Sequence, residues 1–267
     1  MWKLPVERGL RCWARCHDYG AMIALFGPLL DSFLFAFCRV SGFMLLLPGF
    51  ASLRVPMRVR LFIAAGIAVA LAPNIALPSP NSLSPILIAC EITIGVVLGI
   101  LARVYFLALN FAAVTMASFI GLAAMPGVPV DTDEAQAALP SLITLTATAL
   151  LFFSGLHAPL LMALADSYQV LKPGVWLEPA LMLETYQDTL REAFLLALQL
   201  AMPFLAYGLL INLGIGLANK MSPQVPVYFI SMPYVIAGGL ILLYGLGPDV
   251  VSVFIDHFAA RLQDGWF

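Results

Sequence analysis

Five ionisable side chains lie inside long apolar stretches of this sequence, and their placement raises the question of what chemistry they do. They are Asp31, Arg39, Glu91, Arg103 and Asp166. A charge in a hydrocarbon layer is costly, so such groups usually face a partner chain, one another or a wet cavity. The pattern favours structural pairing, with Arg39 and Glu91 supporting assembly by pairing with each other or with a neighbouring subunit. A proton relay or an ion site is the second interpretation.

The other chemistry-bearing residues form no catalytic or metal-binding pattern. His157 has no second histidine at i+4 and no carboxylate near it along the chain, so the helical zinc-site spacing is missing. Cys12 and Cys16 are separated by three residues, one too many for the C-x-x-C-H haem pattern. The sequence also lacks a G-x-S-x-G elbow and a Gly-rich phosphate loop. We therefore expect no enzyme activity, no metal and no cofactor.

Composition predicts that the charged residues belong to a membrane protein. Hydrophobic residues make up 62% of the chain and charged residues 10%, against about 25% charged residues in an ordinary soluble domain. The mean hydropathy is +0.97. A chain of 267 residues has room for one domain with about six apolar segments of ~20 residues. We expect a membrane environment and no nucleic-acid partner.

The apolar residues gather in six segments, all of which are expected to be helices because a spanning backbone must satisfy its own hydrogen bonds. The segments are 21–50, 59–77, 83–116, 139–168, 190–218 and 225–247. As one helix, residues 83–116 would be about 50 Å long, against a hydrocarbon core of about 30 Å. Prolines inside apolar runs favour kinks, and they are Pro28, Pro159, Pro203 and Pro233. Bent helices and helical hairpins are therefore predicted, and straight rods are not.

Basic residues flank the first apolar segment on both sides. The N-terminus is basic, and the loop after the segment carries Arg54, Arg58 and Arg60. A single crossing would place one of these clusters outside the cell, against the positive-inside bias. We therefore expect either a re-entrant hairpin in this segment or a protein that is not a conventional polytopic one.

A pattern typical of a helix end and a turn lies near the C-terminal end of the sequence. Asn219 and Lys220 close one apolar run, and a Ser-Pro turn at Ser222 leads into the next. This order predicts a helical hairpin.

Residues 119–140, FIGLAAMPGVPVDTDEAQAALP, interrupt the apolar pattern near the middle of the chain. Gly121 and Gly127 allow tight bends, and Pro126 and Pro129 prevent a helix from propagating. An acidic triplet follows, which suits either water or the start of the next helix. From the residues alone, an external loop with an acidic cap and a functional loop at membrane depth both remain open.

Several blocks of the sequence, taken together, resemble the FliR/SctT family of type III export-gate proteins. The blocks are FCRVSGFMLLLPGF (37–50), VPMRVRLFIAAGIAVALAP (55–73), EITIGVVLGILARVYF (91–106), LLFFSGLHAPLLMALADSYQVLKPG (150–174) and GLANKMSPQVPVYFISMPYVIAGGL (216–240). His157 and Ser167 match a histidine and a serine of the family. The turn after Ser167 reads LKPG, where many members have Leu-Pro-x-Gly, so only the local turn geometry is expected to differ.

The resemblance implies a structural subunit of the flagellar export gate in the bacterial inner membrane, at the flagellar basal body, that is required for flagellum assembly. Members join FliP-like and FliQ-like subunits, with an FlhB-like subunit outside them, at the channel entrance for unfolded export substrates. The implied fold is all-α and membrane-associated, with long kinked helices and helical hairpins. A basic extension (1–20) precedes a FliP-like half (21–188), which is fused to a FliQ-like hairpin and tail (189–267).

The same resemblance implies a role for residues 119–140. In the family, the stretch between the third and fourth apolar segments projects into the channel and helps to plug it. The residues expected to form the channel plug here are Phe119, Gly121, Leu122, Met125, Pro126, Gly127 and Val128. Apolar contacts would close a narrow pore, and methionine is adaptable enough to seal and reopen it.

Two other functions remain open at this point. One is an SctT-type subunit of an injectisome export gate. The other belongs to a different class: a small secondary transporter also has kinked helices, buried charges and a Gly/Pro-interrupted segment. The sequence shows no corresponding broken segment in its other half and no cluster of polar ligands, which disfavours the transporter.

Overall fold

The computed structural model describes residues 29–51, 55–75, 84–122, 138–173 and 179–264. Helices account for most of these residues, and no strand occurs in these ranges. The predicted all-α membrane fold is therefore confirmed. The chain packs as two compact units, which are Met1–Ile100 with Leu164–Glu178 and Leu101–Ala163 with Pro179–Phe267.

The first unit begins with a helical hairpin. The helix Leu29–Leu46 is followed by α2 (Met57–Leu71) and the short 3-10 helix η1 (Ala72–Asn74). Ala36, Ala68 and Ile75 form a buried cluster between them, and the Ser32 hydroxyl donates to the Ile75 carbonyl at 3.4 Å.

A re-entrant hairpin was one of the two alternatives for residues 21–50, and it does not occur in the described part of this segment, where one helix is continuous from Leu29 to Leu46. The turn comes at the end of the apolar run, where Pro48 precedes Gly49, whose φ is 90°. Glycine adopts this left-handed conformation readily, so the chain reverses there and continues into α2.

Helix α3 (Pro85–Ile120) is a single α-helix of 36 residues. It is about 54 Å long at 1.5 Å per residue. The helix runs without interruption, so a hairpin within this segment is excluded, whereas a bend stays a prediction. Its interior contains no proline, and its glycines are tolerated because other helices pack closely against them. The first part of α3 belongs to the first unit and the remainder to the second.

The fourth apolar segment is broken into two helices. α4 (Ala138–Phe153) and α5 (His157–Val170) are bent by 75°, and Gly155 in the break has a φ of 73°. The predicted bend therefore exists, but it lies before Pro159. That proline occupies the first turn of α5, where its missing N–H has no helical partner to lose.

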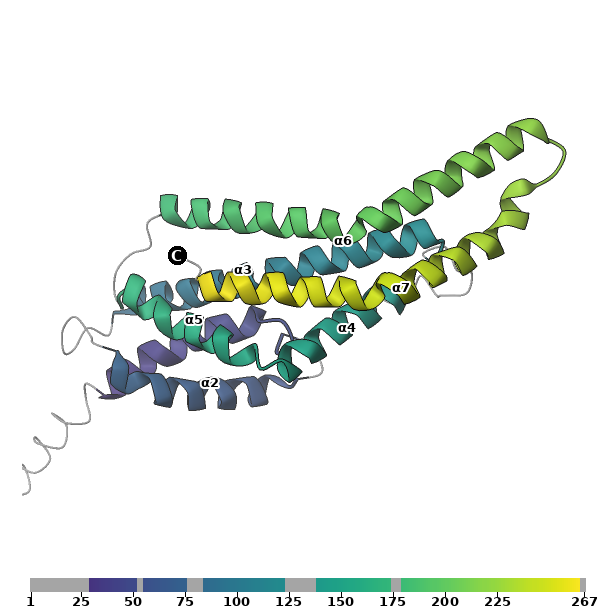
Figure 1. The fold of residues 1–267 in the computed structure, drawn as a ribbon. Helices are drawn as coiled ribbons and strands as arrows, with labels where there is room; N and C mark the ends of the chain where they lie inside the picture. Colours follow the sequence, from purple (N-terminus) through teal and green to yellow (C-terminus); the bar gives the residue numbers. More distant parts are fainter. Residues whose placement is uncertain (1–28, 52–54, 76–83, 123–137, 174–178, 265–267) are drawn as a thin grey trace, which may run out of the picture. The chain divides into compact units, whose positions relative to one another are not determined.

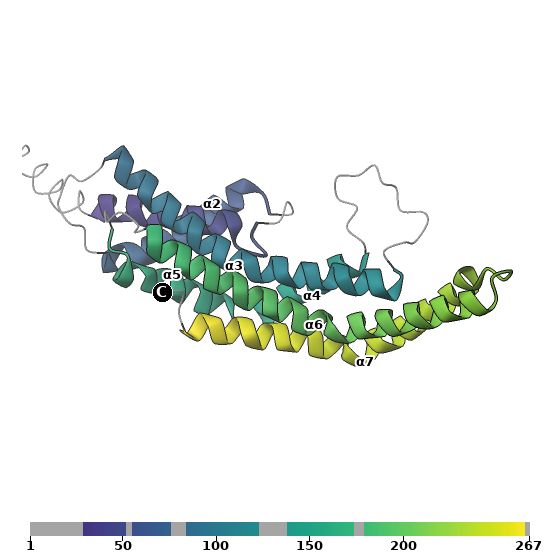
Figure 2. The same ribbon diagram turned by 90° about the horizontal axis from the view of Figure 1, so that it is seen from above.

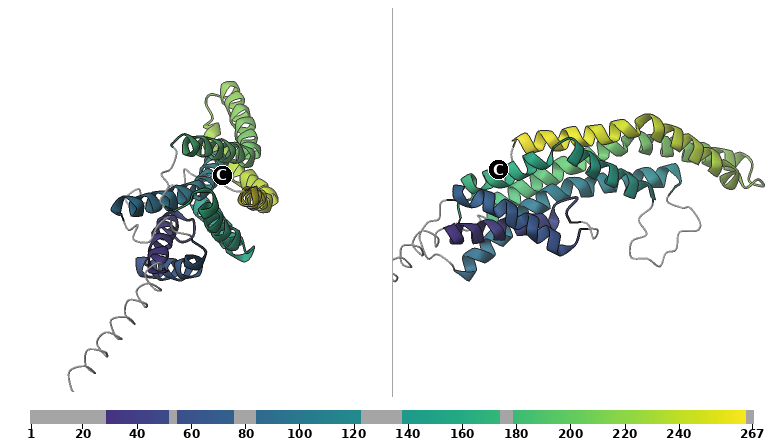
Figure 3. Two further views of the ribbon diagram at one scale, coloured as in Figure 1. Left: turned by 90° about the vertical axis from the view of Figure 1, so that its left-hand side faces the viewer. Right: turned by 90° about the horizontal axis from the view of Figure 1, so that it is seen from below.

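The predicted C-terminal hairpin is confirmed, and it is longer than the sequence pattern indicated. It consists of α6 (Pro179–Met221) and α7 (Val227–Asp264), which lie side by side in every view (Figure 1, Figure 2 and Figure 3). The Tyr207 hydroxyl on α6 donates to the Val235 carbonyl on α7 at 2.7 Å. Helix α6, which contains Pro203, bends in its middle (Figure 1).

Four helices among the described residues are long and apolar enough to span a membrane: Leu29–Leu46, Pro85–Ile120, Met182–Met221 and Val227–Gln263. The bent pair α4–α5 would make a fifth span if it crosses as one unit. The predicted segment 59–77 became α2, which has 15 residues and is only about 22 Å long. α2 is too short to cross. Pro73 has no N–H to continue the helical hydrogen bonds, and the chain passes there into η1.

Candidate functional site

Among the described residues, the two most deeply buried charged side chains form an ion pair in the first unit. Arg39 Nε on the helix Leu29–Leu46 lies 2.7 Å from Glu91 Oε2 on α3, and both side chains are 0% exposed. The sequence left open whether these residues pair with each other or with a neighbouring subunit. In the structure they pair within the chain.

The guanidinium group of Arg39 makes further contacts with the segment at the end of α5. Arg39 Nη1 donates to Ser167 Oγ at 3.1 Å, and Nη2 donates to the Leu171 carbonyl at 3.0 Å. Ser167 in turn donates to the Leu164 carbonyl at 2.6 Å. The Tyr168 ring packs over the guanidinium, with its centroid 3.9 Å from Cζ. One arginine thereby connects three segments that are far apart in the sequence.

Glycines bring the two helices that carry this ion pair unusually close together. Gly95 and Gly99 on α3 face the helix Leu29–Leu46, and a Cβ added at Gly95 would overlap the Arg39 carbonyl oxygen. A Cβ added at Gly42 would lie 2.6 Å from the Ile92 carbonyl oxygen. Small residues at helix crossings in membranes permit this backbone approach. The G-x-x-x-G spacing of Gly95 and Gly99 thus brings the two helix backbones close enough for Arg39 and Glu91 to form their ion pair.

This arrangement is suited to holding helices together. Desolvating two charges is costly, and the cost is recovered only when geometry is good and the remaining donors are satisfied. Arg39 meets that requirement through its four contacts with Glu91, Ser167, Leu171 and Tyr168. Removing one partner of such a pair typically costs about 3–5 kcal/mol. We call these five residues the Arg39 cluster.

The other charges predicted to lie in apolar runs are not part of the Arg39 cluster. Asp31 is buried at the start of the helix Leu29–Leu46, whereas Arg103 and Asp166 are exposed on α3 and α5. His157 is also exposed, and its ring stacks on Phe152 with centroids 6.0 Å apart. Within the described ranges, no three His, Cys, Asp or Glu side chains are grouped as a metal site would require.

A second polar network, which the sequence analysis did not find, joins three helices of the second unit. The Tyr105 hydroxyl on α3 donates to Glu192 Oε2 on α6 at 2.7 Å. Glu192 Oε1 lies 3.6 Å from Arg261 Nη1 on α7. The Glu192 side chain is 48% exposed, so water weakens its attraction to Arg261. Glu192 lies inside α6 and Arg261 near the C-terminal end of α7, and spacing along the chain gave no signal that they meet.

The predicted plug begins where α3 ends. Phe119 is still helical, and Gly121 ends the helix with a φ of 85°. The Leu122 N–H donates to the Ala117 carbonyl at 2.9 Å and the Gly121 N–H to the Ser118 carbonyl at 3.3 Å. This is the Schellman arrangement, in which a glycine closes a helix and turns the chain away from its axis.

Of the predicted plug residues, Phe119, Gly121 and Leu122 are described. Phe119 packs against Gly208 on α6, where an added Cβ would overlap its ring. The other four, Met125, Pro126, Gly127 and Val128, lie outside the described residues, so their role stays a prediction.

The features above define the class of this protein: an all-α membrane protein in which buried and partly buried polar groups tie long helices together. The chain belongs to the family described as bacterial export proteins, family 1, whose profile matches residues 30–260. The family resemblance drawn from the sequence is therefore confirmed.

Similar proteins of known name come from two kinds of bacterial system. The chain is 25% identical over 234 residues to the flagellar biosynthetic protein FliR of Caulobacter vibrioides, covering 85% of this chain and 92% of that protein. It is 28% identical over 241 residues to FliR of Escherichia coli, covering 87% and 90%. It is 32% identical over 186 residues to the secretion system apparatus protein SsaT of Salmonella typhimurium, covering 68% and 71%.

Proposed function

We propose that this chain is a structural subunit of the flagellar type III export gate in the bacterial inner membrane. The observation that carries the proposal is membership of the export family over residues 30–260. Similarity to FliR proteins over 85% or more of the chain supports the flagellar assignment. Four helices able to span a membrane support placement in the membrane.

The subunit forms the channel entrance together with FliP-like and FliQ-like subunits, and an FlhB-like subunit associates with it. This part of the proposal is supported by the exposed apolar surface of the C-terminal hairpin. Large apolar side chains of α6 and α7 are uncovered by the rest of the chain, and the most exposed include Leu209, Leu210, Met221, Phe229, Tyr234, Ile241 and Tyr244. Apolar surface of this extent is typical of an interaction site or a membrane-facing surface. In the proposal, the FliQ-like hairpin 189–267 packs its apolar surface against sibling subunits.

Residues 119–140 act as the plug of the channel when no substrate is passing. The helix end at Gly121 supports this role because it directs the chain away from α3. Beside it, a cleft of about 120 Å³ lies between α3, α6 and α7, with Ser118, Asn212 and Ser231 among its lining residues. Polar side chains at the depth of apolar spans usually face water or protein. The Ser118 and Ser231 hydroxyls donate to carbonyls of their own helices, so Asn212 is the lining residue whose position a water-filled lumen at the level of Gly121 would best account for.

The Arg39 cluster has a structural role in this proposal. Its charges are paired with each other and with polar groups of the same chain, which favours stability and assembly over proton transfer. A small secondary transporter remains the contrasting interpretation, and membership of the export family disfavours it.

A second candidate function is supported by a specific observation. The 32% identity to SsaT is compatible with an SctT-type subunit of an injectisome export gate. The genes beside this one in its genome distinguish the two, since flagellar hook and rod genes favour the first function and injectisome needle genes favour the second.

Deletion of the gene in its own host tests the proposed function. We expect cells without flagellar filaments and without hook and filament proteins in the medium, although those proteins are still synthesised. Expression of the full chain from a plasmid should restore both. Filaments of normal number in the deletion strain would contradict the flagellar role.

A further inference from the structure

The C-terminal end of α3 contacts both helices of the C-terminal hairpin, and it does so at glycines. Phe119 packs on Gly208 of α6, and Ile120 packs on Gly239 of α7, so a Cβ added at either glycine would overlap the side chain beside it. Both glycines and Ile120 are buried. We call these four residues the α3–hairpin contact.

The geometry of this contact fixes the backbone of α3 as well as its side chains. A Cβ added at Gly208 would lie 2.8 Å from the Phe119 Cβ, and one added at Gly239 would lie 2.9 Å from the Ile120 Cβ. Because a Cβ atom is attached directly to the backbone, a change of rotamer does not move it. A residue larger than glycine at either position would therefore force the end of α3 and the hairpin helix apart.

The two hairpin helices are joined at the same level. The hydroxyl of Tyr207, the residue before Gly208, donates to the Val235 carbonyl at 2.7 Å. The same hydroxyl lies 2.6 Å from the position that a Cβ on Gly238 would occupy. Small residues and interhelical hydrogen bonds of this kind hold helices together where water is scarce. The surface that receives the end of α3 is therefore kept in shape by the hairpin itself.

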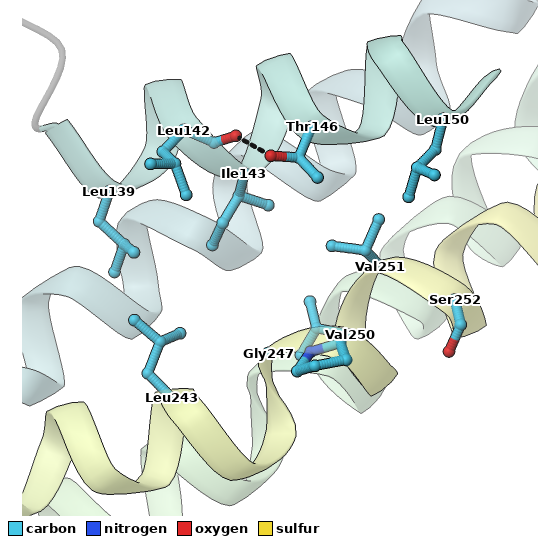
Figure 4. Close-up of a pocket in the computed structure, with 11 residues that line it drawn as sticks. Leu139, Leu142, Ile143, Thr146, Leu150, Leu243, Gly247, Val250, Val251 and Ser252 are labelled. Carbon is cyan, nitrogen blue, oxygen red and sulfur yellow. Dashed lines mark hydrogen bonds between the residues drawn. The ribbon is translucent and has the colours of Figure 1, made fainter. Parts of the chain in front are cut away.

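On one side of this level the hairpin packs against the second unit, and on the other side it does not. Figure 4 shows Ile143 of α4 and Val251 of α7 on opposite sides of one groove, and both side chains are buried. Phe254 of α7 packs edge-on against Phe106 of α3, with ring centroids 5.2 Å apart. By contrast, none of residues 209–238, all of which the structure describes, is buried. The α3–hairpin contact is thus the last buried contact before the hairpin continues without cover from its own chain.

We propose that the hairpin positions the channel plug through the α3–hairpin contact. The chain leaves α3 at Gly121, directly after Ile120, so this contact sets the place from which the following residues start. The inference rests on the proposed plug role of residues 119–140, and it adds two positioning residues outside that stretch, Gly208 and Gly239. Partner subunits that cover the exposed part of the hairpin would act on the plug through the same contact.

The ion conductance of the closed channel tests the proposal, with the full chain purified together with its FliP-like and FliQ-like partners and placed in planar bilayers. Gly208→Ala and Gly239→Ala should each raise the conductance at least threefold in complexes that retain all three proteins, because the start of the plug is displaced. Gly214→Ala and Gly245→Ala are the matched controls on the same two helices, since nothing lies within 4 Å of a Cβ at either position. They should leave the conductance unchanged.

A second measurement follows the contact independently of the channel. Ile120→Cys places a thiol at a position that is 0% exposed, and mass spectrometry of its peptide measures the reaction with a water-soluble maleimide. The thiol should react at least tenfold faster when combined with Gly208→Ala than when combined with Gly214→Ala. If the glycine variants do not assemble, Phe119→Ala removes the packing from the α3 side and should raise the conductance in the same way.

The outcomes separate this inference from the proposed function. If deletion of residues 122–134 does not raise the conductance, the plug role fails and the inference fails with it. If the deletion raises the conductance but the assembled Gly208→Ala and Gly239→Ala complexes, or Phe119→Ala in their place, keep the baseline value, the inference alone is overturned. A raised conductance in Gly208→Ala with a thiol at position 120 that stays unreactive would also overturn it, because the contact would then be intact.

Discussion

Substitution of Glu91 by alanine removes the carboxylate of the buried Arg39–Glu91 ion pair and should destabilise the protein. In Glu91→Ala, the Arg39 guanidinium stays 0% exposed and loses the carboxylate that lies 2.7 Å from its Nε. Breaking a buried pair from one side costs about 3–5 kcal/mol. Arg39 keeps its contacts with Ser167, Leu171 and the Tyr168 ring, so we expect the lower end of that range. About 3 kcal/mol corresponds to a roughly hundredfold change in the equilibrium between folded and unfolded chain.

A double variant separates the loss of the pair from the loss of packing. Arg39→Met combined with Glu91→Leu replaces both charges with apolar side chains, a change that is often neutral at buried pairs. We expect it to recover at least half of the stability that Glu91→Ala loses. The Leu171 carbonyl loses its Arg39 donor in the double variant, which accounts for a remaining deficit of about 1 kcal/mol.

Thermal unfolding of the purified complex, together with its yield from membranes, measures both effects. Arg103→Ala is the control, since Arg103 lies in the same long helix α3 but is exposed. It should change stability by less than ~0.5 kcal/mol. Two results would refute the reasoning. One is a double variant that is no more stable than Glu91→Ala. The other is a Glu91→Ala complex that assembles normally but no longer exports, which would favour proton coupling.

Four other predictions follow from the same structure. Gly95→Ala should destabilise the first unit by about 1–3 kcal/mol because its Cβ would overlap the Arg39 carbonyl; Gly66→Ala, in open space on α2, should be neutral or stabilising in the same melting experiment. Tyr105→Phe should cost about 1 kcal/mol of unfolding free energy by removing the hydrogen bond to a half-exposed carboxylate, and an unchanged melting temperature would contradict this. Deleting residues 122–134 should leave assembly intact and raise the ion conductance of the closed channel in planar bilayers, and an unchanged baseline with normal secretion would remove the plug assignment. A Ser222→Cys variant should crosslink to a FliQ-like or FlhB-like neighbour in cells, since the turn between α6 and α7 leaves Ser222 exposed, and the absence of any crosslink would count against the proposed interface.

The sequence predicted the helical class and the C-terminal hairpin because these depend on local signals. Apolar runs of span length favour helices wherever they occur in a membrane, and the Ser-Pro turn at Ser222 forces a chain reversal. Helix ends were predicted less well. α3 runs without interruption to Ile120 because no proline breaks it. In the first apolar segment, the turn lies at Gly49, at the end of the segment and not within it.

The Arg39 cluster could be predicted only in part. The rarity of charges in apolar runs marked Arg39 and Glu91, but pairing across 52 positions depends on how the two helices cross, and spacing along the chain does not encode that crossing. The G-x-x-x-G spacing of Gly95 and Gly99 was the one available signal for a close approach. The contacts of Tyr105 with Glu192 gave no local signal because both residues are common at helix surfaces.

Co-expression of this chain with the FliP-like and FliQ-like proteins of its own host, followed by affinity purification through a tag on this chain, tests the central claim most directly. The account predicts that all three proteins elute as one complex, and that the chain expressed alone aggregates or is degraded because its hairpin surface is uncovered. A chain that is monodisperse and stable alone in detergent, and that retains neither partner when they are co-expressed, would contradict the export-gate assignment.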